Sequence, residues 1–325
     1  MNSPSQTLRP LGLGEVLDRA VTLCVRHFVP LALIFVIYAI PYAIVEYLAT
    51  QDLTHVISSV TTVLQSQTGG GRAADPSAIV KALGTAPHLN GWYPLLVVLT
   101  FFVGPLPAGA LIHACDAYYF KRETTLRRAY RVALGRWLPL VGVNCLFLGA
   151  GLMLYVGFGL VAIVVTLGLV VLTSSLHAVG VAIAVAIGAA LALVAIAFLI
   201  VATLAVQIAY FTCVIERENS IVAFARGIGR VFIGIGLARS LLVGIAYVTI
   251  AIGIGIVALV GESIVVGLVH NAAAGSAYAA LVRVATAAFT TAFVAIFYYD
   301  LRVREEGLDL ALAADAARDA SLTMA

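Results

Sequence analysis

Residues 137–215 read WLPLVGVNCLFLGAGLMLYVGFGLVAIVVTLGLVVLTSSLHAVGVAIAVAIGAALALVAIAFLIVATLAVQIAYFTCVI, and no Asp, Glu, Lys or Arg interrupts these 79 residues. Soluble domains do not contain so long an uncharged run. Membrane-spanning segments do, because a charge at the bilayer centre costs about 2.5–3.5 kcal/mol even on the lowest scale. The stretch therefore predicts an integral membrane protein.

The composition agrees with this prediction and excludes several other classes. Of the 325 residues, 62% are hydrophobic and 11% are charged, whereas about a quarter of a soluble domain is charged. No polybasic tract with interleaved aromatic residues occurs, so nucleic acid is not an expected partner. Cys24, Cys115, Cys145 and Cys213 lack ligand spacing, and no hydrolase or phosphate-loop motif is present. We therefore predict no metal, no cofactor and no catalytic residues.

The other apolar runs set the number of membrane spans, since a span needs about 20 apolar residues. Runs at 28–50, 93–118, 232–261 and 276–299 supply four spans. The uncharged run supplies either two spans, broken at Thr173-Ser174-Ser175, or four short ones. Basic patches on both sides of it demand an even number, and the single polar break favours two. The expected fold class is an all-α polytopic bundle of six transmembrane helices in one membrane domain, with 305–325 as a tail.

The distribution of basic residues predicts the orientation. Fifteen Arg and Lys lie before the first span, between the even-numbered and odd-numbered spans, or after the sixth span, against two (Arg72 and Lys81) in the opposite loops. Cytoplasmic loops carry the excess of Lys and Arg. We expect a multi-pass protein of the bacterial inner membrane with both termini in the cytoplasm.

A short motif precedes each odd-numbered span. It reads LDRA at 17–20, LRRA at 126–129 and, more loosely, FARG at 224–227. A Pro-Leu pair follows the first two copies ten residues later. The pattern predicts three repeats, at about 8–118, 119–216 and 217–304, each with a short amphipathic helix and two spans. Such helices lie at the interface, where Arg19, Arg26, Arg128 and Arg226 would contact anionic lipid headgroups or a partner.

Three segments resemble a known family. They are LRPLGLGEVLDRA at 8–20, PLPAGAL at 105–111 and, most specifically, YYDLRVREEGLDL at 298–310. Together they resemble the membrane domain of bacterial glycerophosphoryl diester phosphodiesterases, a polytopic and largely uncharacterised family. Because the soluble phosphodiesterase domain of some members has no counterpart here, the resemblance implies no hydrolase activity. Gly227 stands where the family commonly has Ser.

Polar residues inside the spans are candidates for pairs or sites. His113 and Asp116 lie one turn apart and could form a proton relay. We expect instead that Asp116 pairs with a nearby Arg. Arg239 lies inside the fifth span, where we expect Asp116 or Asp300 as its partner or snorkelling toward the headgroups. Near the opposite side, Glu262 and Arg283 are a candidate ion pair.

Three functions fit these features. The first is a non-catalytic membrane module that scaffolds or regulates a protein partner or a second copy of the chain, or organises lipid. The alternative is a transporter or permease for a lipid-like or small amphipathic solute, and the third is an intramembrane enzyme of lipid metabolism. A transporter requires a polar cavity near the middle of the membrane, an enzyme requires convergent ionisable groups, and a scaffold requires an apolar lateral groove.

Overall fold

The fold is known from a computed structural model, which describes residues 9–68, 92–234, 237–307 and 310. Within those ranges, the side chains at 50–68, 155, 158–184 and 234 are not described. The described chain is 91% helical and has no strands, as expected for an all-α fold. It contains six helices long and apolar enough to cross a membrane: Phe28–Ala49, Trp92–Tyr119, Trp137–Leu154, Val185–Ile215, Leu237–Val269 and Ala272–Glu306. The protein is therefore a multi-pass membrane protein.

The first four helices run from the N-terminus to the second span. Helix α1 covers Leu13–Arg26 and α2 covers Phe28–Thr68. The second span consists of α4 (Trp92–Val98), a π-helical turn η2 (Leu99–Val103) and α5 (Pro105–Tyr119). Helix α2 does not end at residue 50, where hydropathy falls, because a helix satisfies its own backbone on either side of the membrane boundary. The loop at 69–91 and the tail at 311–325 lie outside the described residues.

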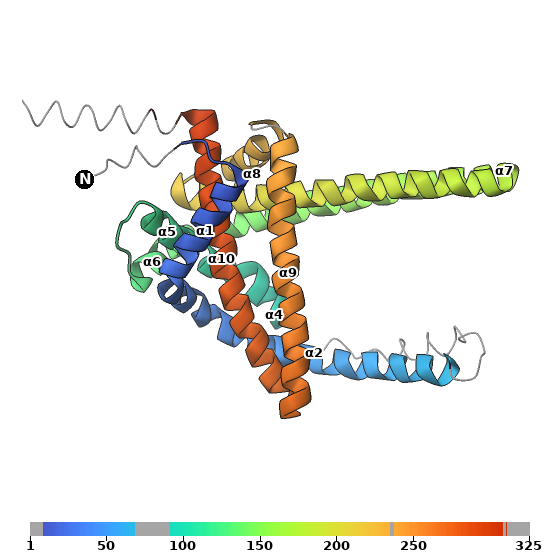
Figure 1. Cartoon of the computed structure of the whole chain (residues 1–325), viewed down its shortest axis with the longest axis horizontal. Coiled ribbons are helices and arrows are strands. Elements are labelled where there is room, and N and C mark those ends of the chain that lie inside the picture. The colour runs from blue at the N-terminus through green and yellow to red at the C-terminus, as the bar shows by residue number, and fades with distance from the viewer. Residues whose placement is uncertain (1–8, 69–91, 235–236, 308–309, 311–325) are drawn as a thin grey trace, which may run out of the picture.

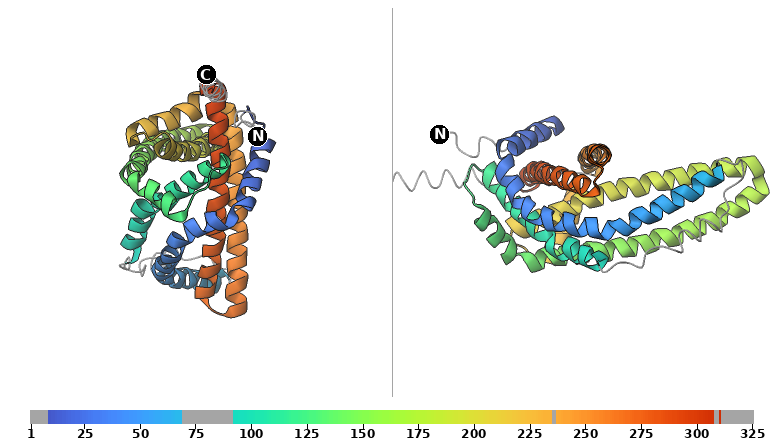
Figure 2. Two further views of the ribbon diagram at one scale, coloured as in Figure 1. Left: turned by 90° about the vertical axis from the view of Figure 1, so that its left-hand side faces the viewer. Right: turned by 90° about the horizontal axis from the view of Figure 1, so that it is seen from below.

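The uncharged run forms one long helical element that doubles back on itself. After α6 (Leu126–Gly135), α7 spans Trp137–Ile215, and a straight helix of that length would reach about 120 Å. Yet the Tyr210 hydroxyl donates to Oδ1 of Asn144, 66 residues away. The two arms run side by side, away from the body of the molecule (Figures 1 and 2). This arrangement gives two spans rather than four among the described residues.

The last elements are α8 (Ser220–Gly229), a second π-helical turn η3 (Arg230–Gly234), α9 (Leu237–Val269) and α10 (Ala272–Glu306). In Figure 1, α9 and α10 run crosswise to α7. Helix α10 is the most buried span, whereas α9 and the arms of α7 bury few residues. The core lies where α5, the end of α7 and α10 meet, around the fully buried Phe211, Phe297 and Tyr298.

The short amphipathic helices share one packing arrangement. Helix α6 packs on α5, α8 packs on α7, and α1 packs on α10 at the other end of the chain. The small residue that closes each sequence motif, Ala20, Ala129 or Gly227, is buried. The expected helix-span-span order is therefore present three times in the element order, although the repeat as a duplication of sequence stays a prediction.

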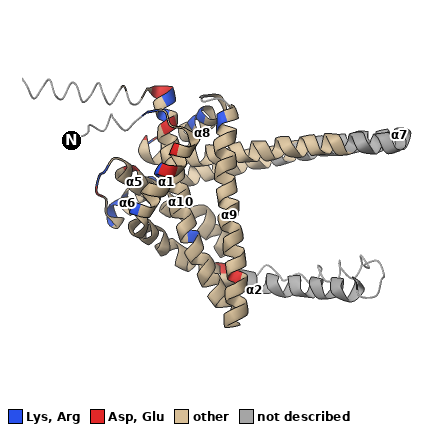
Figure 3. Ribbon diagram, in the orientation of Figure 1, with Lys and Arg blue, Asp and Glu red and all other residues tan. Residues whose placement is uncertain are grey.

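Most charged residues gather at one end of the molecule. In Figure 3 they lie on α1, α6, α8 and the adjoining end of α10, while α7 carries none. We call this region the charged end.

Candidate functional site

One polar cluster at the charged end binds the backbone of the N-terminal segment. The carboxylate of Asp300 is wholly buried and accepts hydrogen bonds from the Leu11 N–H at 2.7 Å and from Nη2 of Arg239 at 2.7 Å. Nε of Arg304 lies 3.0 Å from the same carboxylate, and both arginines donate to the Leu11 carbonyl. The structure thus brings Arg239 together with Asp300, one of its two expected partners. The cluster fixes the start of α1 against α9 and α10.

Asp116 has a different partner from the expected one. Its Oδ1 accepts a hydrogen bond from the hydroxyl of Tyr299, and no arginine forms an ion pair with it among the described residues. The prediction of an Asp116–arginine pair is wrong. Tyr299 of α10, 183 residues further along the chain, occupies the place beside Asp116 where an arginine was expected. Nε2 of His113, one turn earlier, is buried and has no hydrogen-bond partner in the described part of the chain. The structure records no hydrogen bond between His113 and Asp116.

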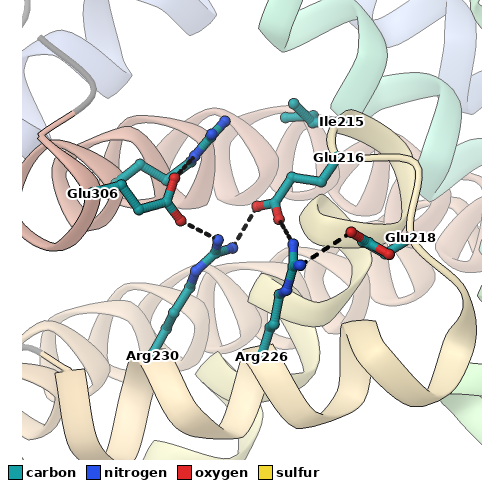
Figure 4. Close-up of a pocket in the computed structure, with 7 residues that line it drawn as sticks. Ile215, Glu216, Glu218, Arg226, Arg230 and Glu306 are labelled. Carbon is teal, nitrogen blue, oxygen red and sulfur yellow. Dashed lines mark hydrogen bonds and ion pairs between the residues drawn. The ribbon is translucent and has the colours of Figure 1, made fainter. Parts of the chain in front are cut away.

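A second cluster joins the ends of α7, α8 and α10 (Figure 4). Glu216 binds Nη1 of Arg226 at 2.6 Å through one carboxylate oxygen, and Arg230 and Tyr298 through the other. Arg230 also reaches Thr212 and Glu306, and Arg226 reaches Glu218. We call this set the Glu216 network. It lines an open recess of about 710 Å³ whose three carboxylates and three guanidiniums balance in charge.

Mutual pairing fixes the protonation of this network. Burial raises the pKa of the Glu216 carboxyl, but hydrogen bonds from Arg230, Tyr298 and Arg226 outweigh burial and hold the pKa below its ordinary value. Burial lowers the pKa of Arg230, whereas its hydrogen bond and charge pairing with Glu216 raise the pKa above the ordinary value. Both groups are therefore charged at neutral pH and are bonded to each other rather than free for proton transfer.

A third polar pair lies far from the charged end. Nη1 of Arg283 on α10 lies 2.8 Å from Oε2 of Glu46 on α2, and the guanidinium covers the ring of Tyr42 at 4.5 Å. The predicted Glu262–Arg283 pair is wrong. Glu262 instead lies close to Gly275, where α9 and α10 meet. The packing of α2 against α10 brings the nearer carboxylate from 237 residues away, which hydropathy cannot reveal.

The proline-rich start of α5 creates a polar site that the sequence analysis missed. Pro105 has no N–H to offer the Phe101 carbonyl, so the helix widens into the π-helical turn η2. Asn144 of α7 donates to that carbonyl at 3.1 Å, and Nε1 of Trp137 donates to the Phe102 carbonyl at 2.7 Å. A lone Asn inside the uncharged run, downstream of a Gly-Pro break, was the available signal.

Two apolar recesses lie along the spans. One has a volume of about 440 Å³ and runs between α2 and α10, beside Ala39, Ile44 and Ala277. The other has a volume of about 410 Å³ and lies between the arms of α7 and helix α8, beside Phe147, Phe198 and Phe224. We call them the α2/α10 groove and the α7/α8 groove. Aliphatic and aromatic atoms dominate both linings, which suits a hydrocarbon occupant.

The four interfacial arginines differ in their surroundings. Arg26 and Arg128 are exposed. Arg226 is half-exposed, but its guanidinium is held by Glu216 and Glu218. Arg19 is partly buried beside the Tyr119 hydroxyl. Arg26 and Arg128 are therefore the members most available to a ligand from the membrane.

Comparison with known proteins found no match to any family model, any curated protein or any solved structure. The resemblance drawn from the three sequence segments stays an expectation. No group of three His, Cys, Asp or Glu side chains with the geometry of a metal site occurs in the described ranges.

Proposed function

We propose that this protein is a non-catalytic membrane module that organises lipid, with its charged end in the cytoplasm. Its spans would hold phospholipid acyl chains in lateral grooves, while its short amphipathic helices rest among anionic headgroups. A protein partner or a second copy of the chain could bind through the same apolar faces, with lipid as the primary ligand.

One observation carries the proposal: the recesses along the spans are apolar, whereas the carboxylates of the Glu216 network and of Asp300 are bound by arginine. The α2/α10 groove extends from Val36 to Leu48 on α2, about 18 Å at 1.5 Å per residue. That length matches roughly one leaflet of a hydrocarbon core about 30 Å thick. The carboxylates of the Glu216 network and of Asp300 are already bound by arginine. A catalytic acid or base must be within hydrogen-bond reach of the substrate atom that gives up or takes the proton. Carboxylates already bound by arginine are poorly placed for that role.

A transporter is the second candidate, and one observation favours it. Glu46 and Arg283 form an ion pair within the candidate spans, and each side chain is about one-third exposed. Intramembrane ionisable groups often mark a substrate or ion pathway. If the protein moves a lipid-like solute, the Glu46–Arg283 pair is the candidate site on its pathway.

The test fills the α2/α10 groove. Ala277 is exposed in the groove, so Ala277→Phe should block it, whereas Ala189→Phe adds the same bulk to an exposed face of α7 that lines neither groove. Native mass spectrometry of protein purified from membranes then counts the retained phospholipids. We expect the first variant to lose a lipid that the wild type and the second variant keep, and equal counts in all three would contradict the proposal.

A flux assay separates the alternative. Liposomes containing the protein and a fluorescent phospholipid report transbilayer movement. Movement above that of protein-free liposomes, abolished by Glu46→Gln in a folded protein, would establish the transporter and overturn the non-catalytic module.

A further inference from the structure

Positive charge is concentrated in one short segment of the charged end. Residues 121–136 read KRETTLRRAYRVALGR and carry six cations and one carboxylate. Their net charge of +5 exceeds that of the whole chain, which is +3, so the rest of the chain is net negative. The segments of the other two short helices are nearly balanced, with two cations and two carboxylates at 13–26 and three cations and two carboxylates at 216–230. We call residues 121–136, the turn before α6 and α6 itself, the α6 segment.

The cations of the α6 segment also differ from those around α8 in having no carboxylate partner. None of the six forms an ion pair within the described ranges, whereas Arg226 of α8 is bound by Glu216. Arg26 and Arg217 likewise form no ion pair in those ranges, but each lies on one of the two nearly balanced segments. The α6 segment is therefore where an excess of unneutralised positive charge accumulates.

This charge faces away from the protein. Arg127 and Arg131 are one helical turn apart, with Arg128 beside them, and the buried Ala129 and Ala133 lie on the other side of the helix, against α5. Five of the six cations are exposed: Lys121, Arg122, Arg127, Arg128 and Arg131. In Figure 3 the basic residues of α6 can be followed on the outer side of α5. The α6 segment thus presents a cationic face that nothing in the described part of the chain covers.

The α6 segment changes from charged to apolar along its length. A Cβ on Gly109 of α5 would lie 3.3 Å from the Cβ of Ala133, and Gly109 precedes the end of α5 at Tyr119 by ten residues, or about 15 Å. The end of α6 therefore lies deeper along the span than its beginning. Leu134 and Leu138, at that deeper end, are 59% and 73% exposed. Cations at the span end, followed by exposed apolar side chains further in, match the order of headgroup and acyl chain in a lipid leaflet.

We propose that the α6 segment is the surface by which this protein recognises anionic phospholipids. Its arginines contact the headgroup phosphates, while Leu134 and the exposed Trp137 lie at the start of the acyl region, where Trp is enriched. Guanidinium groups match phosphate with paired N–H donors. The inference rests on the proposed function and deepens it, because it assigns headgroup recognition to one of the three short helices and to one class of lipid.

The experiment titrates the full chain in mild detergent with phosphatidylglycerol and, separately, with phosphatidylcholine, while native mass spectrometry counts the bound lipids. The variant Arg127→Gln/Arg128→Gln/Arg131→Gln removes the outward cations of α6. Each cation near an anionic surface strengthens binding by about five-fold, so half-saturation with phosphatidylglycerol should need at least about ten-fold more lipid. Binding of phosphatidylcholine should not change. The preference of the wild type for phosphatidylglycerol should also weaken as salt is added.

Two further variants separate recognition by α6 from folding and from net charge. Arg127→Lys/Arg128→Lys/Arg131→Lys keeps the charge and should bind phosphatidylglycerol within about two-fold of the wild type. Arg9→Gln/Arg26→Gln/Arg217→Gln removes the same number of exposed cations from other segments of the charged end and should also stay within about two-fold. An equal loss in this control, or an equal loss in the lysine variant, would overturn the inference. Wild-type binding in the glutamine variant would overturn it as well, and would leave the cationic face to an acidic protein partner.

Failure of the inference and failure of the proposed function are distinguishable. If the glutamine variant of α6 binds phosphatidylglycerol as the wild type does while Ala277→Phe still loses its lipid, the α6 surface is wrong and the lipid-organising function stands. If the wild type moves phospholipid across the bilayer while the glutamine variant loses its preference for phosphatidylglycerol, the opposite holds.

Discussion

Gly227 shows how a single residue determines where a helix can pack. A Cβ at this position would lie 2.7 Å from the Ala205 carbonyl oxygen and 2.9 Å from the Ala209 Cβ on α7. The first two copies of the motif have Ala here. The close approach of α8 to α7 explains why this copy has Gly.

We therefore expect Gly227→Ala to lower the free energy of unfolding by about 1–3 kcal/mol, the usual effect of overpacking. Gly229→Ala is the matched control, because it lies on the same helix with no atom within 4 Å of the added Cβ. Alanine favours the helix there by up to about 1 kcal/mol. Thermal unfolding in detergent measures both variants. Equal changes in the two variants would show that contact with α7 does not decide the result.

Asp300 is the residue on which the N-terminal segment depends. Asp300→Asn removes the charge that faces Arg239 and Arg304 in a wholly buried site. Breaking a buried pair in this way costs about 3–5 kcal/mol. We expect lower stability and, in hydrogen exchange, faster exchange of the Leu11 amide and the start of α1. Asp18→Asn, at an exposed position of α1, should change neither measurement. Unaltered Leu11 exchange in the Asp300 variant would argue against the clamp.

At the scale of elements, the ends of the long helices are joined by charge rather than by apolar packing alone. The Glu216 network connects the end of α7 with α8 and with α10. Helix α8 is ten residues long, so it depends on such contacts because isolated helices of that length are marginal in water.

The network predicts a dependence of stability on acid. The folded-state pKa of Glu216 lies below its ordinary value of 4.5. As a result, its stabilisation is complete above pH 4.5 and is lost as the pH falls through the folded-state pKa. We expect the unfolding temperature to fall in that range, and Glu216→Gln to be less stable at neutral pH by about 3 kcal/mol with a shallower acid dependence. An identical acid profile in the variant would assign the transition to other carboxylates.

At the scale of the whole molecule, the distribution of charge predicts which side faces the cytoplasm. Arg131 on α6 and His270 between α9 and α10 are exposed at opposite ends of the spans. Cys24, Cys115 and Cys213 are buried, and Cys145 lies within a span, so an introduced cysteine would dominate labelling. In intact cells, a membrane-impermeant thiol reagent should label His270→Cys but not Arg131→Cys. The reverse pattern would invert the proposed topology.

Much of the architecture followed from local sequence. The predicted span at 93–118 lies within one residue of Trp92–Tyr119 in the structure, and the first span begins at Phe28 as predicted. The short helices before the odd-numbered spans also formed where apolar residues recur at helical spacing. Helix α2 continues to Thr68, beyond the predicted span at 28–50, because hydropathy reports where a chain leaves lipid and not where its helix stops.

The sequence by itself determined that most of the chain lies in hydrocarbon rather than water, how many spans it has and at which end charged residues accumulate. Each of these depends on the transfer of a local stretch between water and hydrocarbon, which composition describes. Only the tertiary structure decided that Asp116 bonds to Tyr299 and that Arg283 pairs with Glu46. Those partners depend on which helix faces meet across separations of up to 237 residues. Hydropathy does not describe those faces, because a polar group in lipid pairs with whichever partner the packing brings within reach.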